Sequence, residues 1–153
     1  YKMDIVRVRP FNHIGPRQST AFVIPAFAKQ ISEIEKDPRK PLLVGNLEAI
    51  RDFTDVRDMV KAYVLALEQC PSGEVYNLGS GTGYKISDLL YILISLSKTK
   101  INVKKDNSRF RPIDIPVLIC NNFKFREITG WQPEINIKDT LADVLYYWRE
   151  QVL

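Results

Sequence analysis

Two arginines occupy positions from which they could bind phosphate. Arg51 ends a strand-like segment directly before a helix, and Arg111 closes a basic stretch that begins at Lys104. A guanidinium group can donate two parallel hydrogen bonds to the oxygens of a diphosphate, and Pro112 holds the residue before it in an extended conformation. Binding of a diphosphate is therefore one interpretation of Arg51. The basic stretch that contains Arg111 is interpreted, on its own residues, as a solvated loop.

A glycine-rich stretch, Gly79-Ser-Gly-Thr-Gly83, is a second candidate for phosphate binding. It follows a strand-like run and precedes a helix, as a phosphate-binding loop does. However, Tyr84 stands where the dinucleotide fingerprint G-x-G-x-x-G requires its third glycine, and the chain has no G-x-x-x-x-G-K motif. The pattern favours an ordinary flexible turn between a strand and a helix.

A third candidate is the segment Pro10-Phe-Asn-His-Ile14, which follows a strand-like run. Open α/β sheets bind ligands just beyond the carboxyl ends of their strands. Asn12 offers both a donor and an acceptor to a sugar or a phosphate. His13 could serve as an acid or a base, although a histidine that is hydrogen-bonded within a turn is favoured.

The residue types that bind metals do not form a metal-binding pattern. Three aspartates stand at the start of a predicted helix: Asp52, Asp55 and Asp58. Carboxylates are stabilised there by the helix dipole, so capping by Asp55 is favoured over a metal. Cys70 and Cys120 have no metal-type spacing with each other or with His13. Both cysteines are predicted to be reduced core residues of a cytoplasmic protein.

The composition is that of a folded protein, and its charge fits anionic small molecules at least as well as nucleic acid. The chain has 153 residues, of which 45% are hydrophobic and 26% charged, so one domain with a real core is expected. The net charge of +4 is mildly basic. Nucleic-acid binding would require a wider basic face with exposed aromatic residues. No apolar run reaches the roughly 18 residues of a membrane span, so no membrane partner is expected.

Strand-like and helix-like segments alternate along the chain, which indicates an α/β fold. Strands are expected at 4–9, 42–44, 49–53, 74–78 and 101–103, with an apolar run at 117–120 and a loop at 11–18. Helices are expected from about 20 to 36, from 56 to 70, from 87 to 97, from 122 to 130 and from 137 to 151. The second helix shows the clearest apolar periodicity. Its predicted buried stripe is Val56, Met59, Val60, Tyr63, Val64 and Leu67.

The order of five short motifs resembles that of the extended short-chain dehydrogenase/reductases, the nucleotide-sugar epimerases, dehydratases and reductases. The motifs are Arg-Pro-Phe-Asn-His-Ile-Gly-Pro, Arg-Asp-Phe-Thr-Asp-Val-Arg-Asp, Val-Tyr-Asn-Leu-Gly-Ser-Gly, Arg-Pro-x-Asp and Gly-Trp-x-Pro. Each is weak alone, but all five occur in the family's order over essentially the whole chain. The chain resembles the carboxyl-terminal half of such an enzyme. The branch with GDP-mannose 4,6-dehydratases and GDP-4-keto-6-deoxymannose reductases is most similar.

This resemblance implies roles for particular residues. Residues 1–18 and 52–80 would complete a Rossmann-type sheet, and 19–51 and 81–153 would form the nucleotide-sugar-binding domain. The cofactor, NADP or NAD, would contact Pro10, Phe11, Asn12, His13 and Ile14. The nucleotide sugar would contact Asn12, Leu43, Val44, Arg51 and Arg111, with the two arginines on the diphosphate. The basic residues Lys104, Lys105 and Arg109 have no matched role and are expected to be solvated.

The chain also departs from the family. Neither the glycine-rich NAD(P) loop nor the catalytic Tyr-x-x-x-Lys pair is present. No catalytic residue is therefore expected in this chain. We expect it to be inactive alone, to belong to a homodimeric or homotetrameric enzyme, and to be poorly soluble or oligomeric because its sheet edges lack partners.

Three other functions stay open at this point. The chain could be part of a UDP- or dTDP-sugar epimerase or dehydratase. It could also be a non-catalytic protein that binds nucleotide sugars, or a small basic module that binds nucleic acid.

Overall fold

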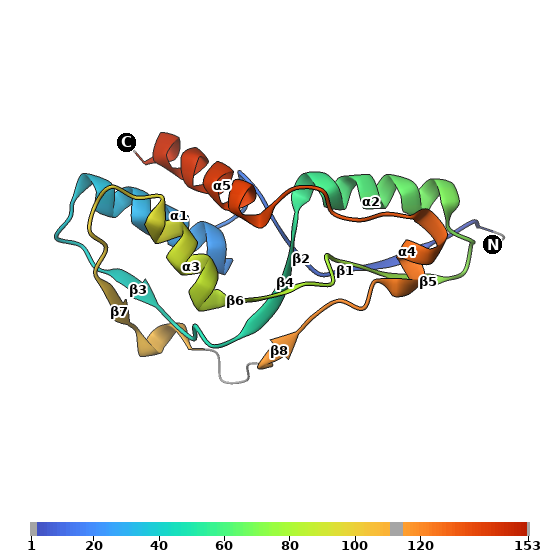
Figure 1. Cartoon of the computed structure of the whole chain (residues 1–153), viewed down its shortest axis with the longest axis horizontal. Helices are drawn as coiled ribbons and strands as arrows, with labels where there is room; N and C mark the ends of the chain where they lie inside the picture. The colour runs from blue at the N-terminus through green and yellow to red at the C-terminus, as the bar shows by residue number, and fades with distance from the viewer. Residues whose placement is uncertain (1–2, 111–114, 153) are drawn as a thin grey trace.

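A computed structural model describes residues 3–110 and 115–152; Arg111 lies outside this range. The chain forms an elongated α/β structure in two parts (Figure 1). The helices are α1 (Val23–Lys36), α2 (Val56–Gln69), α3 (Ile86–Ser95), α4 (Phe123–Thr129) and α5 (Ile137–Gln151), with a 3-10 turn, η1, at Asn107–Arg109. The strands are β1 (Arg7–Pro10), β2 (Asn12–Ile14), β3 (Leu42–Val44), β4 (Ile50–Asp55), β5 (Val75–Leu78), β6 (Gly83–Lys85), β7 (Val103–Lys105) and β8 (Val117–Leu118).

The strands pair mostly in parallel, which confirms the predicted α/β class. β1 pairs with β5, β2 and β8 with β4, and β3 with β7, all in parallel, whereas β6 is antiparallel to β4. The predicted loop at 11–18 is wrong at its start, because Asn12 to Ile14 form β2. Asn12 pairs with Phe53 and Ile14 with Asp55, so a long-range partner makes this short segment extended.

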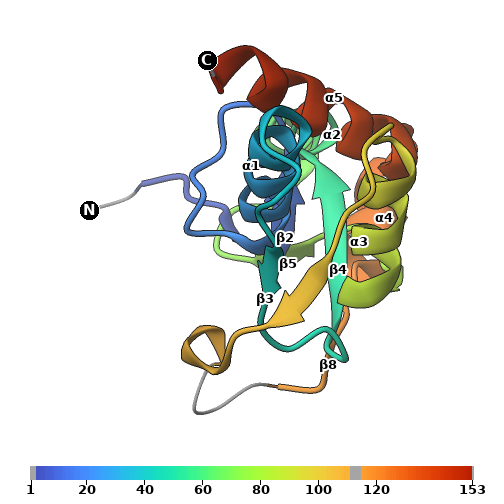
Figure 2. The ribbon, with the colours of Figure 1, turned by 90° about the vertical axis from the view of Figure 1, so that its left-hand side faces the viewer.

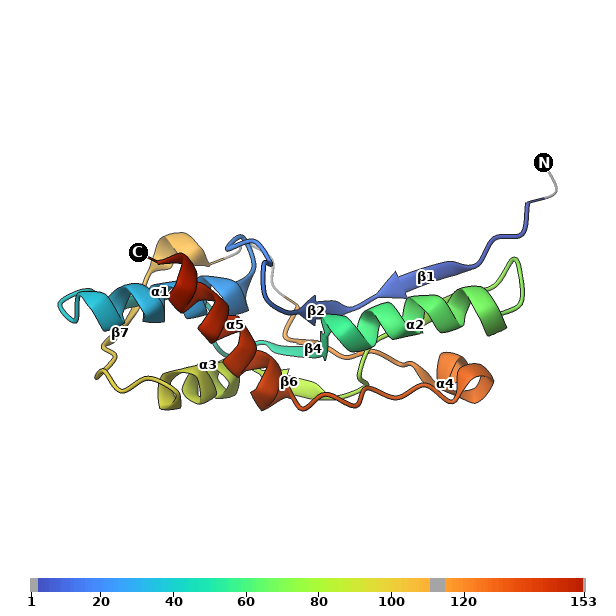
Figure 3. The same ribbon diagram turned by 90° about the horizontal axis from the view of Figure 1, so that it is seen from above.

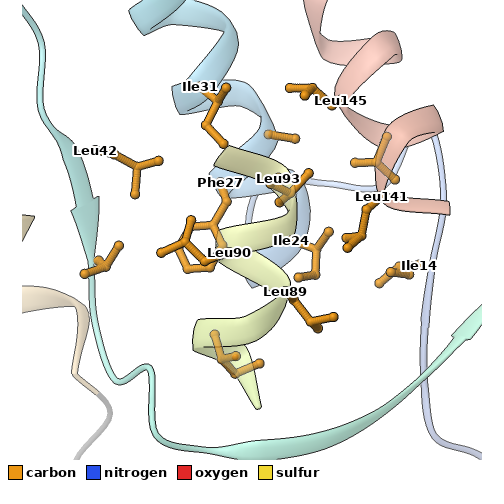
Figure 4. Close-up of a cluster of buried hydrophobic side chains, with 14 of the residues drawn as sticks. Ile14, Ile24, Phe27, Ile31, Leu42, Leu89, Leu90, Leu93, Leu141 and Leu145 are labelled. Atoms are coloured by element: carbon orange, nitrogen blue, oxygen red, sulfur yellow. The ribbon is translucent and has the colours of Figure 1, made fainter. Parts of the chain in front are cut away.

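The larger core lies between α1, α3 and α5 (Figures 2 and 4). The apolar residues of α1 recur every three or four positions, and Phe27, Ile31 and Ile34 are buried as predicted. Leu89, Leu90 and Leu93 of α3 and Leu141, Val144 and Leu145 of α5 complete this core. The apolar periodicity of the sequence also predicts burial of Leu96 and Trp148. The structure differs, because Leu96 is exposed and Trp148 is only partly buried.

The smaller core lies between the β1–β5 pair, α2 and α4. Its buried residues are Met59, Ala62, Ala66, Tyr76, Leu78, Phe125 and Trp131. Phe125 makes aromatic contacts with Tyr76 and Trp131. The chain enters this part three times, with β1, with α2 and β5, and with α4 and the following loop, which contributes Trp131.

The prediction of the buried stripe of α2 is wrong for three of its residues. Met59 is buried, but Val60, Val64 and Leu67 are 53%, 47% and 81% exposed. The helix turns its small residues Ala62 and Ala66 inward instead. β1, beside α2, pairs with β5 along one edge, and no described strand pairs with its other edge (Figure 3). An apolar helix face and an open strand edge therefore lie in the same part of the molecule.

Replacing Val60 and Val64 together with glutamine is expected to leave the fold intact and to reduce self-association. Exposed substitutions usually change stability by less than about 0.5 kcal/mol, and an apolar patch of this kind promotes association. Sedimentation velocity and thermal melting of the double variant test this. The single variant Met59→Gln is the matched control, since a buried glutamine there should lower the melting temperature strongly. A double variant that associates as the parent does would contradict the prediction.

Candidate functional site

A cavity of about 890 Å³ lies where β2, the start of α1, β3, β4 and η1 meet. It is lined by most of the residues that the sequence nominated: Pro10, Phe11, Asn12, His13, Ile14, Leu43 and Arg51. These residues come from segments that are up to 41 positions apart in the chain. The structure therefore brings together side chains that the resemblance assigns to the cofactor and to the nucleotide sugar.

The chain changes its strand partner at Phe11, and this change positions the first group of site residues. Up to Pro10 the backbone pairs with β5, and from Asn12 onward it pairs with β4. The backbone N–H of Phe11 still donates to the carbonyl of Leu78 at 2.8 Å. The segment thus crosses from one parallel strand to another at a carboxyl end, where open α/β sheets form ligand crevices.

Asn12 and His13 are both held by backbone groups. The side-chain amide nitrogen of Asn12 donates to the carbonyl of Asp52 at 3.0 Å, which leaves its amide oxygen as an acceptor. Nδ1 of His13 lies 3.2 Å from the carbonyl of Phe11. A carbonyl can only accept, so Nδ1 carries the proton in this contact. The histidine is thus hydrogen-bonded to a nearby backbone group, as the sequence favoured, although it lies in β2 and not in a turn.

Arg51 lies at the edge of the cavity between β4 and β8. Its Nη1 donates to the carbonyl of Ile50 at 2.8 Å and lies 3.4 Å from that of Pro116. Arg111, the second predicted member of the diphosphate clamp, lies outside the described residues, so its role stays a prediction.

Leu43 lines the cavity, whereas the side chain of Val44 is 1% exposed and belongs to the larger core. This differs from the expectation that both residues flank a nucleobase. The reason is that consecutive side chains of a strand point to opposite faces. Gln30 of α1 braces the strand, because its Oε1 accepts from the N–H of Leu43 at 2.8 Å and its Nε2 donates to the carbonyl of Leu43 at 3.2 Å.

The glycine-rich stretch does bind an anion, but that anion is the protein's own carboxylate. Asp52 is fully buried and accepts from the backbone N–H groups of Ser80 and Gly81 and from the hydroxyl of Ser80, at 2.7 to 2.9 Å. The N–H of Cys120 donates to it at 3.1 Å. A Cβ on Gly79 would lie 2.6 Å from Cβ of Cys120, which accounts for the glycine there. The expectation of a merely flexible turn is therefore incomplete, because Asp52 fixes the turn.

Asp52 also affects the chemistry of its neighbour Cys120. Burial and the nearby carboxylate raise the pKa of this thiol to about 12. The thiol is buried and stays protonated at neutral pH, in agreement with its predicted place in the core. Cys70 is only partly buried.

Sequence reasoning missed several residues of the cavity: Gln18, Thr20, Phe22, Asn46 and Arg109. Arg109 is exposed, as expected, but η1 also places it on the cavity wall, where it pairs with Asp106 at 3.2 Å. A Cβ atom on Gly45 would lie only 2.5 Å from the backbone carbonyl oxygen of Arg109. Only a glycine at 45 allows η1 to pack so closely.

Asp55 caps α2 and also links that helix to α5. Its carboxylate accepts from the backbone and side chain of Arg57 at 2.8 to 2.9 Å and from the hydroxyl of Thr140 at 2.7 Å. Burial raises the pKa of Asp55, but the hydrogen bonds from Arg57 and Thr140 and the charge of Arg57 outweigh it, so the pKa is lowered overall. Removing this carboxylate is expected to cost more than the roughly 1 kcal/mol of a simple cap.

The lowered pKa of Asp55 predicts acid sensitivity. Unfolded aspartate has a pKa of about 3.9. The stabilisation from Asp55 is therefore complete above that pH and is lost as the pH falls through the lower folded pKa. Urea unfolding at several pH values between about 5 and 2.5 tests this. Asp55→Asn should be less stable than the parent at pH 5 and should lose less stability on acidification. Parallel curves for the two proteins would contradict the prediction.

Comparison with known proteins shows the family of this chain. The family model for GDP-mannose 4,6 dehydratase matches residues 1–144. The chain belongs to this family. It is 35% identical over 149 residues to the GDP-6-deoxy-D-mannose reductase of Pseudomonas aeruginosa, covering 97% of this chain and 49% of the reductase. It is 29% identical to the GDP-6-deoxy-D-talose 4-dehydrogenase of Aggregatibacter actinomycetemcomitans over 82% of this chain and 42% of that enzyme.

Solved structures agree with the sequence comparison. The structure of RMD from Pseudomonas aeruginosa complexed with NADPH matches 96% of this chain and 49% of its own, with a TM-score of 0.89 and 34% identity. A UDP-glucuronic acid 4-epimerase from Bacillus cereus, solved with NAD, matches 97% of this chain and 46% of its own, with a TM-score of 0.82 and 27% identity. These matches confirm the Rossmann-type fold and NAD(P) as the family's cofactor. The chain spans about half the length of these relatives.

Proposed function

We propose that this chain is the nucleotide-sugar-binding half of an NAD(P)-dependent dehydratase or reductase that acts on GDP-mannose or GDP-4-keto-6-deoxymannose. The observation that carries the proposal is the single cavity onto which Asn12, Leu43 and Arg51 converge from three different strands. It offers a polar amide, an apolar wall and a guanidinium group, which suit a sugar, a base and a diphosphate respectively. Two of its relatives act, by name, on GDP-linked deoxy sugars.

The residues Pro10–Ile14 fit the sugar and nicotinamide side of such a site. Pro10 and Asn12 are exposed at the carboxyl end of β1, where dinucleotides bind in open α/β sheets. NAD(P) supplies the hydride acceptor or donor when it is bound. This chain's residues would orient the ligands: Asn12 through its amide oxygen, Leu43 by its apolar side chain and Arg51 by its charge.

The partner of this chain is proposed to be the other half of the enzyme, which carries the Tyr-x-x-x-Lys pair and the glycine-rich loop. Two observations support this. The unpaired edge of β1 offers a parallel strand a place in the sheet, and the exposed face of α2 offers a helix an apolar contact. We further propose that the complete enzyme is a homodimer or homotetramer in the cytoplasm. Within the described residues, no helix has the length and apolar character of a bilayer span.

An activity assay tests whether catalysis needs groups outside this chain. The purified 153-residue chain is expected to produce no turnover of GDP-mannose with NADP⁺, because no described side chain offers the tyrosine base that the family mechanism uses. The chain combined with the half of the Pseudomonas aeruginosa reductase that it does not match provides the comparison. Turnover by this chain alone would overturn the proposal that it is a binding half.

A UDP-sugar enzyme is the second candidate. The favouring observation is the likeness to UDP-glucuronate 4-epimerases, both in sequence, at 30% identity over 99% of this chain, and in structure. The two candidates differ in the nucleobase. Competition between GDP and UDP for the cavity therefore separates them.

A further inference from the structure

Gln18 is a cavity residue to which the resemblance assigns no role. It follows β2 in the chain and lines the same cavity as Asn12 and His13. Its Nε2 donates to the carbonyl of His13 at 2.9 Å. This bond fixes the orientation of the side-chain amide, because only the nitrogen can donate to a carbonyl.

The other amide atom of Gln18 has no partner. Its Oε1 is buried and accepts no hydrogen bond within the described part of the chain. A buried acceptor without a donor is destabilising, and such atoms in native proteins usually mark a site that a water or a ligand completes. Gln30 is an internal comparison, because both of its amide atoms are hydrogen-bonded to backbone groups.

The backbone beside Gln18 is strained. Arg17 has a φ of +70°, and it is the only non-glycine residue with a positive φ in the described ranges. Left-handed backbone is unfavourable for an arginine. Gly15, at the start of the same turn, is packed so closely that a Cβ would lie 2.5 Å from Val56. Strain of this kind persists where the surroundings enforce it and is concentrated at ligand sites.

We propose that Oε1 of Gln18 accepts a hydrogen bond from a hydroxyl group of the hexose of the bound nucleotide sugar. This inference rests on the proposed function, because it takes the cavity as the nucleotide-sugar site. The bond to His13 connects Gln18 to the segment that the proposed function gives to the sugar. A hydroxyl is the complementary group, since Oε1 can only accept.

The test is calorimetric titration of the 153-residue chain and two variants with GDP and with GDP-mannose. Gln18→Met removes the acceptor and keeps the length of the side chain. It is expected to weaken the binding of GDP-mannose by about fivefold to tenfold, the value of one hydrogen bond, and to leave the affinity for GDP unchanged. Gln30→Met is the matched control. It removes the brace of Leu43, so it should change the two affinities by the same factor.

The outcomes separate the inference from the function on which it rests. If Gln18→Met changes the affinities for GDP and GDP-mannose equally, or changes neither affinity, then the side chain does not contact the hexose. That result overturns the inference and leaves the proposed function standing. If the parent chain melts cooperatively but binds neither ligand, the proposed function falls and the inference falls with it. A loss confined to GDP-mannose in Gln18→Met, with equal changes in Gln30→Met, supports the inference.

Discussion

Replacing Asp52 with alanine is expected to destabilise the chain by about 3–5 kcal/mol, because each hydrogen-bonding group that loses its acceptor costs roughly 1–3 kcal/mol. The carboxylate is fully buried and accepts hydrogen bonds from Ser80, Gly81 and Cys120. Its removal leaves three backbone N–H groups without an acceptor. Because these groups belong to separate segments, the turn at 79–83 and the segment before α4 should both loosen.

Urea unfolding measures this effect, with Asp139→Ala as the control. Asp139 is an exposed aspartate in the first turn of α5, and its loss should cost at most about 1 kcal/mol through the helix dipole. Hydrogen exchange adds a local readout, since the amides of Gly81 and Cys120 should lose protection in Asp52→Ala. Similar unfolding midpoints for the two variants would show that the carboxylate does not hold these segments together.

Replacing Arg51 with alanine is expected to weaken nucleotide binding by about 10- to 100-fold. A hydrogen bond to a charged group contributes about 1.5–3 kcal/mol, and the guanidinium group is the proposed contact with the diphosphate. The loss should be equal for GDP and GDP-mannose, because both carry the diphosphate. Calorimetric titration with the two ligands measures it. The same substitution at Arg111 is expected to have an effect of similar size.

Arg149→Ala is the control for Arg51. Arg149 pairs with Glu35 at 2.6 Å and donates to the carbonyl of Leu96, and it does not line the cavity. Its loss should lower the melting temperature and leave nucleotide affinity unchanged. If both arginine variants weaken nucleotide binding by the same factor, the effect of Arg51→Ala is a general loss of structure and not a lost ligand contact.

The helices were predictable from sequence because their apolar residues recur with the helical period. The α2 face shows the limit of this reasoning. Periodicity finds apolar residues, but it does not say which of two apolar stripes meets the sheet. In α2 the alanines pack against β1 and β5, and the valines stay exposed.

The site was predictable where a motif carried it and unpredictable where tertiary contacts made it. The motif around Asn12 placed that residue correctly on the cavity wall. By contrast, nothing local indicates that Arg109 reaches the cavity, because its position depends on η1 packing against Gly45. Likewise, the glycine-rich stretch looks like a phosphate loop until the long-range carboxylate of Asp52 is found inside it.

The most direct test of the central claim is the thermal shift of the purified chain with GDP, UDP, dTDP and GDP-mannose. The claim is that this chain itself contains the nucleotide-sugar pocket. A ligand at about 100 times its dissociation constant stabilises the folded state by about 2.7 kcal/mol, which is a readily measured shift. We expect GDP and GDP-mannose to raise the melting temperature and UDP and dTDP to have little effect. A chain that melts cooperatively and responds to none of the four ligands would contradict the claim.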